Sequence, residues 1–390
     1  MSNVAKYLFI LKKHFIFWNG NSKFKSAINL LSILITTLSL TFIILVLSIN
    51  NGFKKHIIDK LIDIDGYVHV SDKYYSKPFE GTISDDNYTY TEIYSIKSLI
   101  KSSGYSDGVI LNAFDLNGYN VIKLGNYIID GEYSDGGLII GNGLAQKLHI
   151  KVGDYAYLIN VIDEKEFNIN NLIVSGIYKT NIPYYDDYSI YINKNHLENF
   201  IISDYHNKSF IFNSIDENSN NYNSSFDVLK NNYHIDYWYD RHDKFIKWLF
   251  SYDAPINILL IFIFIISLIN LISSTYIDIA IRRDENMLLY TLGFDINNIK
   301  RLYVFKNSVI SFVSILFTLI FLYTFIYINS FYPLIDVPSE IYFTSTIPIE
   351  VNYVHFIIFF FYMLFISQLS TFISFKNSLK NNNIIKVDHI

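Results

Sequence analysis

The 390-residue sequence contains no cysteine and relatively few charged residues. Without cysteine, a disulfide framework, a cysteine-ligated zinc site and thiol catalysis are excluded. Charged residues make up 17% of the chain, below the roughly 25% that is typical of globular domains. The formal net charge of −5 provides no basic surface for nucleic acid, so we expect no nucleic-acid partner.

The chain also lacks the motifs of several enzyme classes: it has no G-x-x-x-x-G-K-[ST] loop for ATP phosphates, no G-x-S-x-G and no H-E-x-x-H. "GNGLA" at residues 141–145 resembles a dinucleotide loop, but a lone GxG is a weak signal. The His and Asp residues of "HIDYWYDRH" at 234–242 could bind a metal, yet the interleaved aromatic residues favour a strand ending in a turn. "YYDD" at 184–187 favours a turn before a strand. We therefore predict no catalytic, cofactor-binding or metal-binding residues and a protein that is not an enzyme.

What the chain has instead is four long apolar runs. A mean hydropathy of +0.22 is too low for a chain made only of membrane spans, and it fits spans combined with a polar domain. Each run is long enough to cross a hydrocarbon core of roughly 30 Å as a helix. None contains Asp, Glu, Lys or Arg, which argues against an ion-coupled transporter. The predicted spans are residues 27–49, 254–277, 307–332 and 353–375.

The flanks of these runs predict the topology. Lys and Arg gather before the first run, between the second and third, and after the fourth, whereas residues 333–352 contain neither. Since basic flanks stay in the cytoplasm, both termini are predicted to be cytoplasmic. The cytoplasmic segments are then 1–26, with an interfacial helix in "KYLFILKKHFIFW", 278–306 and the tail 376–390. The segments outside are the large region 50–253 and the short loop 333–352.

Region 50–253 is predicted to be a mixed α+β domain. "GYVHV", "GVILNAF", "YAYLINV", "NLIVSGIY" and "YSIYIN" predict strands because they are rich in β-branched and aromatic residues. "TEIYSIKSLIKSSG" at 91–104 predicts a helix with Ile93, Ile96, Leu99 and Ile100 on one face, capped by Gly104. We also expect a short helix and tight turn at 141–154, a polar loop at 214–225, and a helix from Asp243 into the second span.

A charged stretch, "DIAIRRDENMLLYTLGFDINNIKRL" at 278–302, lies between the second and third spans. Ile277, Ile281, Leu288 and Leu292 predict one apolar stripe on a helix that ends at Gly293, a residue suited to a left-handed C-cap. Asp295 suits the N-cap of the next helix. A short amphipathic helix joined to two spans could act as a lever that tilts both. The alternative is a simple interfacial helix.

The predicted spans contain small polar residues. Such residues usually mark faces where membrane helices pack closely, which we favour over a polar substrate track. In either case they predict helix partners, which we expect in another subunit. The candidates are Thr36, Thr37, Asn257, Ser267 and Asn270.

Several motifs, in order, resemble those of the FtsX/MacB-type ABC transporter permeases. The most specific is "GLIIGNGLAQKLHIKVGDYAYL" at 137–158, and "VSGIYKTNIPYYDDYSIYI" at 174–192 follows it. "LLYTLGF" at 288–294 stands where the family has its coupling helix. The chain is most similar to the LolC/LolE-like lipoprotein-releasing branch. The resemblance implies four transmembrane helices with a MacB-like periplasmic core between the first two.

The resemblance also implies partners. The coupling helix would dock into a cytoplasmic LolD-like ATPase that binds ATP and Mg, so this chain itself binds no cofactor. A second permease copy or paralogue, membrane lipid, a lipoprotein substrate and a LolA-like periplasmic carrier complete the set, in the bacterial inner membrane. The alternatives are an FtsX-like mechanotransmission subunit that regulates a cell-wall hydrolase and a MacB-like efflux permease. The implied coupling residues are Arg282, Arg283, Asp284, Glu285, Leu288, Leu289, Leu292 and Gly293.

Overall fold

The computed structural model describes most of the chain, and its contacts divide the chain into two units. A membrane unit comprises 1–53, 251–335 and 348–390, and an outer unit comprises 54–250 and 336–347. The predicted interfacial helix and nearly all of the predicted polar loop at 214–225 lie outside the described residues. The described residues are 23–72, 88–102, 104–163, 166–199, 208–214, 226, 228–332, 337–338, 343–344 and 346–380.

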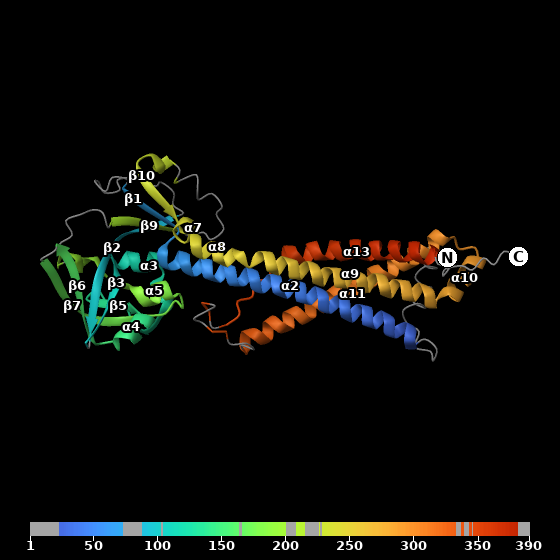
Figure 1. Ribbon diagram of the computed structural model, residues 1–390, viewed down its shortest axis with the longest axis horizontal. Helices are drawn as coiled ribbons and strands as arrows, with labels where there is room; N and C mark the ends of the chain where they lie inside the picture. Colours follow the sequence, from blue (N-terminus) through green and yellow to red (C-terminus); the bar gives the residue numbers. More distant parts are fainter. Residues whose placement is uncertain are drawn as a thin grey trace. The chain divides into compact units, whose positions relative to one another are not determined.

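Four long helices, labelled in Figure 1, form most of the described part of the membrane unit. Each contains one predicted span, except that the third helix ends one residue before the predicted end at Tyr332. All four are long and apolar enough to cross a membrane, as the sequence predicts. A helix satisfies its own backbone hydrogen bonds, which an uncharged segment in lipid requires. The four are α2 (Lys23–Asp65), α9 (Asp253–Ile281), α11 (Ile296–Phe331) and α13 (Tyr353–Lys380).

One apolar cluster draws residues from all four helices, including Leu40 of α2, Leu271 of α9, Ile310 of α11 and Met363 of α13. Much of the remaining apolar surface faces outward. In the most apolar 18-residue stretch of the helix that contains α9, only 17% of the residues are buried. The corresponding share in α2 is 33%. The helix α9 is therefore the least covered of the four and has the most surface left for lipid or a partner.

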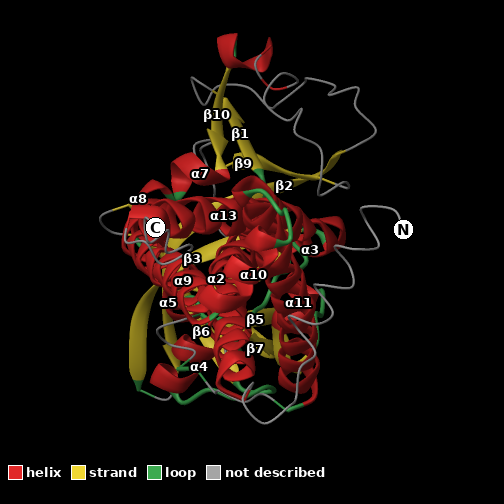
Figure 2. Ribbon diagram, turned by 90° about the vertical axis from the view of Figure 1, so that its right-hand side faces the viewer, coloured by secondary structure: helices red, strands yellow, loops and turns green. Residues whose placement is uncertain are grey.

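The outer unit is built on one large sheet whose strands are yellow in Figure 2. The strand order is β10-β1-β9-β2-β3-β8-β5-β7-β4, and β6 pairs with β2 and β7. The pairs β3–β8 and β5–β7 are parallel, and the other pairs are antiparallel. The strands are β1 (Val68–Asp72), β2 (Tyr88–Ser102), β3 (Tyr105–Phe114), β4 (Ile128–Gly131), β5 (Gly137–Gly141), β6 (Tyr155–Asp163), β7 (Glu166–Tyr178), β8 (Ser189–Asn193), β9 (Lys208–Ser214) and β10 (Tyr233–Tyr237).

Short helices complete the outer unit. The predicted helix and turn at 141–154 are confirmed, with a left-handed residue at His149 and Gly153 at φ +93°. The helix predicted from Asp243 is confirmed as well, and Tyr252 separates it from α9. The helices are α3 (Leu116–Val121), α4 (Asn142–Leu148), α5 (Pro183–Tyr188), α7 (Trp238–Arg241) and α8 (Asp243–Ser251).

The helix predicted at 91–104 is wrong, because this segment forms most of strand β2. The strand pairs with β9 in its first half and β6 in its second, and its buried positions change phase between the two halves. Ile93, Ile96 and Ile100 are consequently buried at helix-like spacing, while Leu99 remains 45% exposed. Long pairing with β3 decides the conformation, and Gly104, with φ +87°, lies in the β2–β3 hairpin turn.

Candidate functional site

The charged stretch between α9 and α11 forms a separate short helix, α10 (Arg283–Thr291), visible in Figure 1. The helix α9 ends at Ile281, and Arg282 leaves helical geometry with φ −97° and ψ 20°. Gly293 adopts φ +89°, and the Asp295 carboxylate accepts a hydrogen bond from the Ile296 amide at 2.8 Å. The predicted turn and N-cap are therefore confirmed.

The predicted apolar stripe is wrong as a single helix, because the break at Arg282 places Ile277 and Ile281 on α9. The two leucines of the predicted stripe nevertheless lie together on an exposed face. Leu288 is 60% exposed and Leu292 is 69% exposed. Leu289 packs inward against a cluster formed by α9, α11 and α13. The helix α10 thus has an inner face fixed to the spans and an outer face with exposed leucines.

A buried ion cluster attaches the start of α10 to two spans. Asp278 of α9, only 1% exposed, accepts a hydrogen bond from Arg282 Nε at 2.9 Å. Its second carboxylate oxygen pairs with the ammonium of Lys306 on α11. Arg282 and Lys306 are 5% and 3% exposed, so three charges share one dry site. Burial of a charge is costly unless it is paired, and this cluster strongly favours one arrangement of the helices.

Arg282 also donates from its Nη1 to the half-exposed Glu285, at 3.0 Å. The coupling set inferred from the sequence therefore divides into two groups. Arg282 is buried, and Arg283 and Leu289 are partly buried. The exposed members are Asp284, Glu285, Leu288, Leu292 and Gly293. Sequence reasoning missed Asp278 and Lys306 as partners. The available signal was that each lies next to an otherwise uncharged run.

Neutral hydrogen bonds extend this joint to the fourth span. Asn286, which is fully buried, donates to the Tyr303 hydroxyl at 3.1 Å. Asn307 donates to Thr275 at 2.8 Å and to Thr371 of α13 at 2.9 Å. The contacts link α9, α10, α11 and α13 at one end of the membrane unit, so a force on α10 acts on three spans together.

The small polar residues predicted at helix interfaces fall into two groups. The Thr36 hydroxyl lies 2.7 Å from the Ser314 hydroxyl on α11. The Thr318 hydroxyl of the same helix donates a hydrogen bond to the Thr37 carbonyl. Ser267 is also buried by this chain. These three residues are packed within this chain, and the partners expected in another subunit stay a prediction. Asn257 is exposed on α9, and Asn270 is partly buried.

The "YYDD" segment has a structural role. It forms the short helix α5, which leads into β8 as the predicted turn requires. Asp186 accepts hydrogen bonds from the Thr180 amide and hydroxyl, both at 2.8 Å, and from the Asn181 amide at 2.9 Å. Burial raises the pKa of Asp186 above its usual value despite these bonds.

The glycines of "GNGLA" allow close packing. A Cβ on Gly141 would lie 2.3 Å from the Asp186 carbonyl oxygen, and one on Gly143 would lie 1.8 Å from the Asp187 carboxylate. Both clashes involve α5. The two glycines therefore let α5 approach the start of α4 closely.

The "HIDYWYDRH" segment forms strand β10 and then helix α7, where the prediction had a turn. Arg241 donates from Nε to Asp65 at 2.8 Å, and His242 Nε2 lies 3.0 Å from the same carboxylate. His69 lies beside Asp65, and burial and Arg241 lower its pKa to about 4 although Asp65 opposes the shift. These residues join the end of α2 to the start of α8. Among the described residues, no group of three His, Asp or Glu is arranged for a metal.

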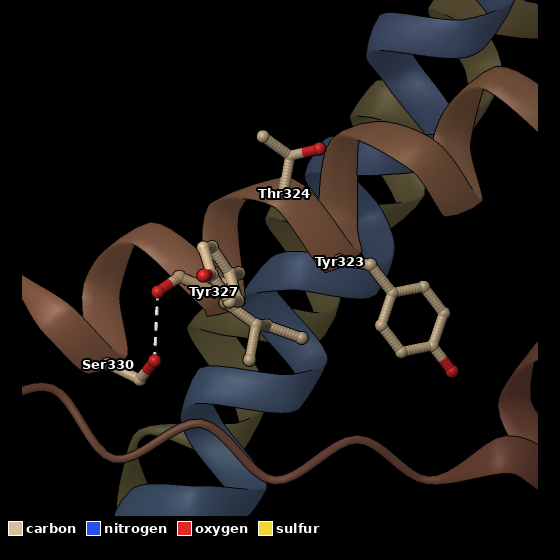
Figure 3. Close-up of a pocket in the computed structure, with 5 residues that line it drawn as sticks. Tyr323, Thr324, Tyr327 and Ser330 are labelled. Carbon is tan, nitrogen blue, oxygen red and sulfur yellow. Dashed lines mark hydrogen bonds between the residues drawn. The ribbon is translucent and has the colours of Figure 1, made fainter.

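A groove of about 600 Å³ lies on α11 (Figure 3). The Ser330 hydroxyl donates to the Tyr327 carbonyl at 2.8 Å, and none of the described residues that line the groove is charged. Tyrosines at the end of a span are typical of a membrane interface. The groove offers apolar and hydroxyl surface but no catalytic constellation. Its lining residues are Tyr323, Thr324, Ile326, Tyr327 and Ser330.

Comparison with known proteins finds two matching families and several similar proteins. Residues 257–382 match the FtsX-like permease C-terminal family, and residues 29–221 match the MacB-like periplasmic core domain. The lipoprotein-releasing system transmembrane protein LolC of Buchnera aphidicola subsp. Schizaphis graminum (strain Sg) is 24% identical over 377 residues, covering 89% of this chain and 92% of LolC. The extracellular domain of the noncanonic ABC-type transporter YknZ from Gram-positive bacteria gives 18% identity and a TM-score of 0.31, covering 43% of this chain and 98% of that domain.

Proposed function

Because the chain belongs to the FtsX/MacB-type family of ABC transporter permeases, we propose that it is the permease subunit of a lipoprotein-releasing transporter. Members of this family are multi-pass membrane subunits that work with a partner ATPase and are not themselves catalytic. In our proposal, ATP hydrolysis by a LolD-like ATPase drives extraction of lipoproteins from the bacterial inner membrane. The extracted lipoprotein passes to a periplasmic LolA-like carrier.

The observation that carries the choice of substrate is the likeness to a lipoprotein-releasing protein over 89% of the chain, through both units. The chemistry of the spans supports it. The four predicted spans contain no Asp, Glu, Lys or Arg, so their exposed faces suit acyl chains better than ions. The sparsely covered α9 offers the largest apolar face for a lipid-modified substrate or for a second permease copy.

The helix α10 supplies the proposed coupling mechanism. Leu288 and Leu292 would insert into a groove on the ATPase, and Arg283 and Asp284 would contact its rim. ATP and Mg would bind on that partner, and this chain would bind neither. When the ATPase moves α10, the ion pairs of Asp278 would carry the motion directly into α9 and α11.

The placement of the chain follows from the basic flanks of the spans. We propose that both termini and α10 are cytoplasmic and that the outer unit is periplasmic. A second permease copy or paralogue would pack on α9, where exposed Asn257 offers a polar contact within an otherwise apolar face.

A second function is supported by the FtsX-like match over 257–382. The same lever could move the outer unit to switch a periplasmic cell-wall hydrolase without transporting anything. A MacB-like efflux permease is the other alternative, suggested by the match over 29–221.

Purification in mild detergent from native membranes, followed by mass spectrometry of bound proteins and lipids, tests these proposals. An ATPase together with a triacylated lipoprotein is the result expected for lipoprotein release. An ATPase with a cell-wall hydrolase and no lipid-modified cargo would replace that proposal with mechanical switching. Absence of any ATPase would contradict both.

A further inference from the structure

The loop between α11 and α13 belongs partly to the outer unit. Residues 336–347 cluster with the outer unit, and the chain returns to the membrane unit at Pro348. The outer unit is therefore joined to the membrane unit through three segments, the last of which is joined at both of its ends. The first runs through α2 at Lys54, the second leaves α8 at Phe250, and the third is this loop.

All three connections meet at Phe343 within the outer unit. Its ring centroid lies 5.3 Å from that of Phe245 and 6.1 Å from that of Trp248, both on α8. Its carbonyl oxygen accepts a hydrogen bond from Lys60 Nζ of α2, at 2.7 Å. The same ammonium donates to the Thr180 carbonyl at 3.0 Å, just after strand β7. One residue thus contacts both helical connections, and Lys60 extends the contact to the sheet.

The backbone of Phe343 indicates that this contact is imposed by its surroundings. Phe343 has φ +58°, in the left-handed region that residues with a side chain rarely adopt. Such a conformation persists only where surrounding contacts hold it. The ring contacts and the Lys60 hydrogen bond provide that restraint.

Just beyond Phe343, the same loop is fixed within the membrane unit. The Glu350 amide donates to the Ser48 carbonyl of α2 at 3.1 Å. A Cβ on Gly52 would lie 2.5 Å from the Pro348 carbonyl oxygen, so the loop packs directly on the glycine of α2. Only residues 344–347 separate Phe343 from Pro348. The chain therefore joins Phe343 to a fixed point of the membrane unit through only four residues.

We propose that Phe343 is a positioning residue that carries movement of the membrane helices into the outer unit, with Lys60 as its partner. Movement at the start of α13 would pull the tether at residues 344–347. Phe343 would then move α8 through its ring and α2 through its carbonyl, and Lys60 would pass the motion to Thr180. The inference rests on the proposed function, because it supplies the link between ATP-driven motion of the spans and the domain that handles the substrate.

Hydrogen exchange of the chain alone in lipid nanodiscs tests the anchor without any partner. Phe343→Ala removes the ring, and Phe343→Gly removes it while relieving the backbone strain. In both variants, we expect exchange of the amides of 243–251 to increase about tenfold, because an aromatic contact is lost from a locally opening segment. Lys60→Met should have the same effect at Asn181 and Ile182. Unchanged exchange in all three variants would overturn the proposal.

Matched controls remove similar side chains where they are exposed. Phe361→Ala deletes a phenyl ring that is 65% exposed on α13, and Lys151→Met removes an exposed ammonium from the outer unit. Neither control should alter exchange in 243–251 or at residues 181–182. An equal increase in the controls would indicate general loosening and would also count against the anchor.

The second measurement separates positioning from simple packing. The permease is purified with its ATPase, and exchange in the outer unit is compared with and without ATP and Mg. In Phe343→Ala, ATP turnover should stay within about twofold of wild type, because Phe343 is not part of the proposed ATPase-contacting helix α10, while the nucleotide-dependent change in the outer unit is lost. A full nucleotide response in this variant would exclude the positioning role. If no ATPase accompanies the wild type, the proposed function fails, and exchange of the chain alone still decides whether Phe343 anchors the loop.

Discussion

Two arginine–aspartate clusters occupy opposite kinds of surroundings in this chain. At the joint between α9 and α11, the Asp278 side chain is 1% exposed and pairs with Arg282 and Lys306. At the end of α2, the Asp65 side chain is 24% exposed and pairs with Arg241 and two histidines. The first cluster contains an aspartate, an arginine and a lysine. The second contains an aspartate, an arginine and two histidines.

This difference suggests different mechanical roles. A dry ion cluster makes the geometry at α10 nearly all-or-none, since a broken pair leaves an uncompensated buried charge. Such a joint suits the transmission of force. The cluster at Asp65 retains contact with water, so partial rearrangement costs less. It suits a connection that keeps α2 and α8 together while allowing small rearrangements in the outer unit.

Removing the buried acid should have the largest effect on stability. Asp278→Asn leaves Lys306 buried without its counter-charge and Arg282 paired with Glu285 alone, and we expect a loss of about 3 kcal/mol in the free energy of unfolding. Thermal unfolding of the full chain in detergent measures this loss. Asp284→Asn, which removes an exposed charge from α10, is the control. Equal unfolding temperatures for the two variants would refute the difference between buried and exposed acids.

The corresponding change in the outer cluster should be milder. Asp65→Asn weakens the bonds from Arg241 and His242, and partial exposure limits the loss to about 2 kcal/mol. Hydrogen exchange of strand β1 reports it locally. Asp236→Asn is the control because that carboxylate is 42% exposed and pairs with exposed His234. If Asp65→Asn cost as much as Asp278→Asn, the comparison of the two clusters would fail.

Lowering the pH should reduce the stability of the outer cluster through its histidine His69. The pKa of His69 is about 4 in the folded protein, below its usual 6.5, so the unfolded chain takes up a proton first as pH falls. Its contribution to stability is present above about pH 6.5 and is lost as pH falls toward 4, with about 3 kcal/mol at stake. Protection of β1, corrected for intrinsic exchange, should fall over this range. His69→Gln should reduce that fall, whereas His234→Gln should not.

The exposed leucines of α10 should affect stability least while affecting assembly strongly. Replacing Leu288 and Leu292 together with Asp changes only exposed side chains, so the free energy of unfolding should move by about 0.5 kcal/mol or less. Co-purification of the ATPase should nevertheless be lost. Leu116→Asp, an equally exposed leucine in the outer unit, should retain the ATPase. Normal ATPase recovery with the double variant would rule out the proposed coupling surface.

Local sequence signals predicted part of the candidate site. The turn at Gly293 and the cap at Asp295 depend on residues beside them in the chain, and both are present. Arg282 was assigned to the ATPase-facing surface, whereas it is buried against Asp278. The sequence shows that this arginine is charged, but it does not show that Lys306 approaches the same carboxylate from another helix.

The sequence by itself determined the four spans, the α+β domain between the first two and the short helix after the second. The reason is that lipid demands uncharged helical runs of about 20 residues, and strands and caps carry local patterns. Tertiary structure alone decided that residues 91–102 form a strand, which charges are buried and where the last loop is anchored. Those outcomes depend on distant partners, such as Lys60 and Phe343, which are 283 residues apart and meet only in the fold.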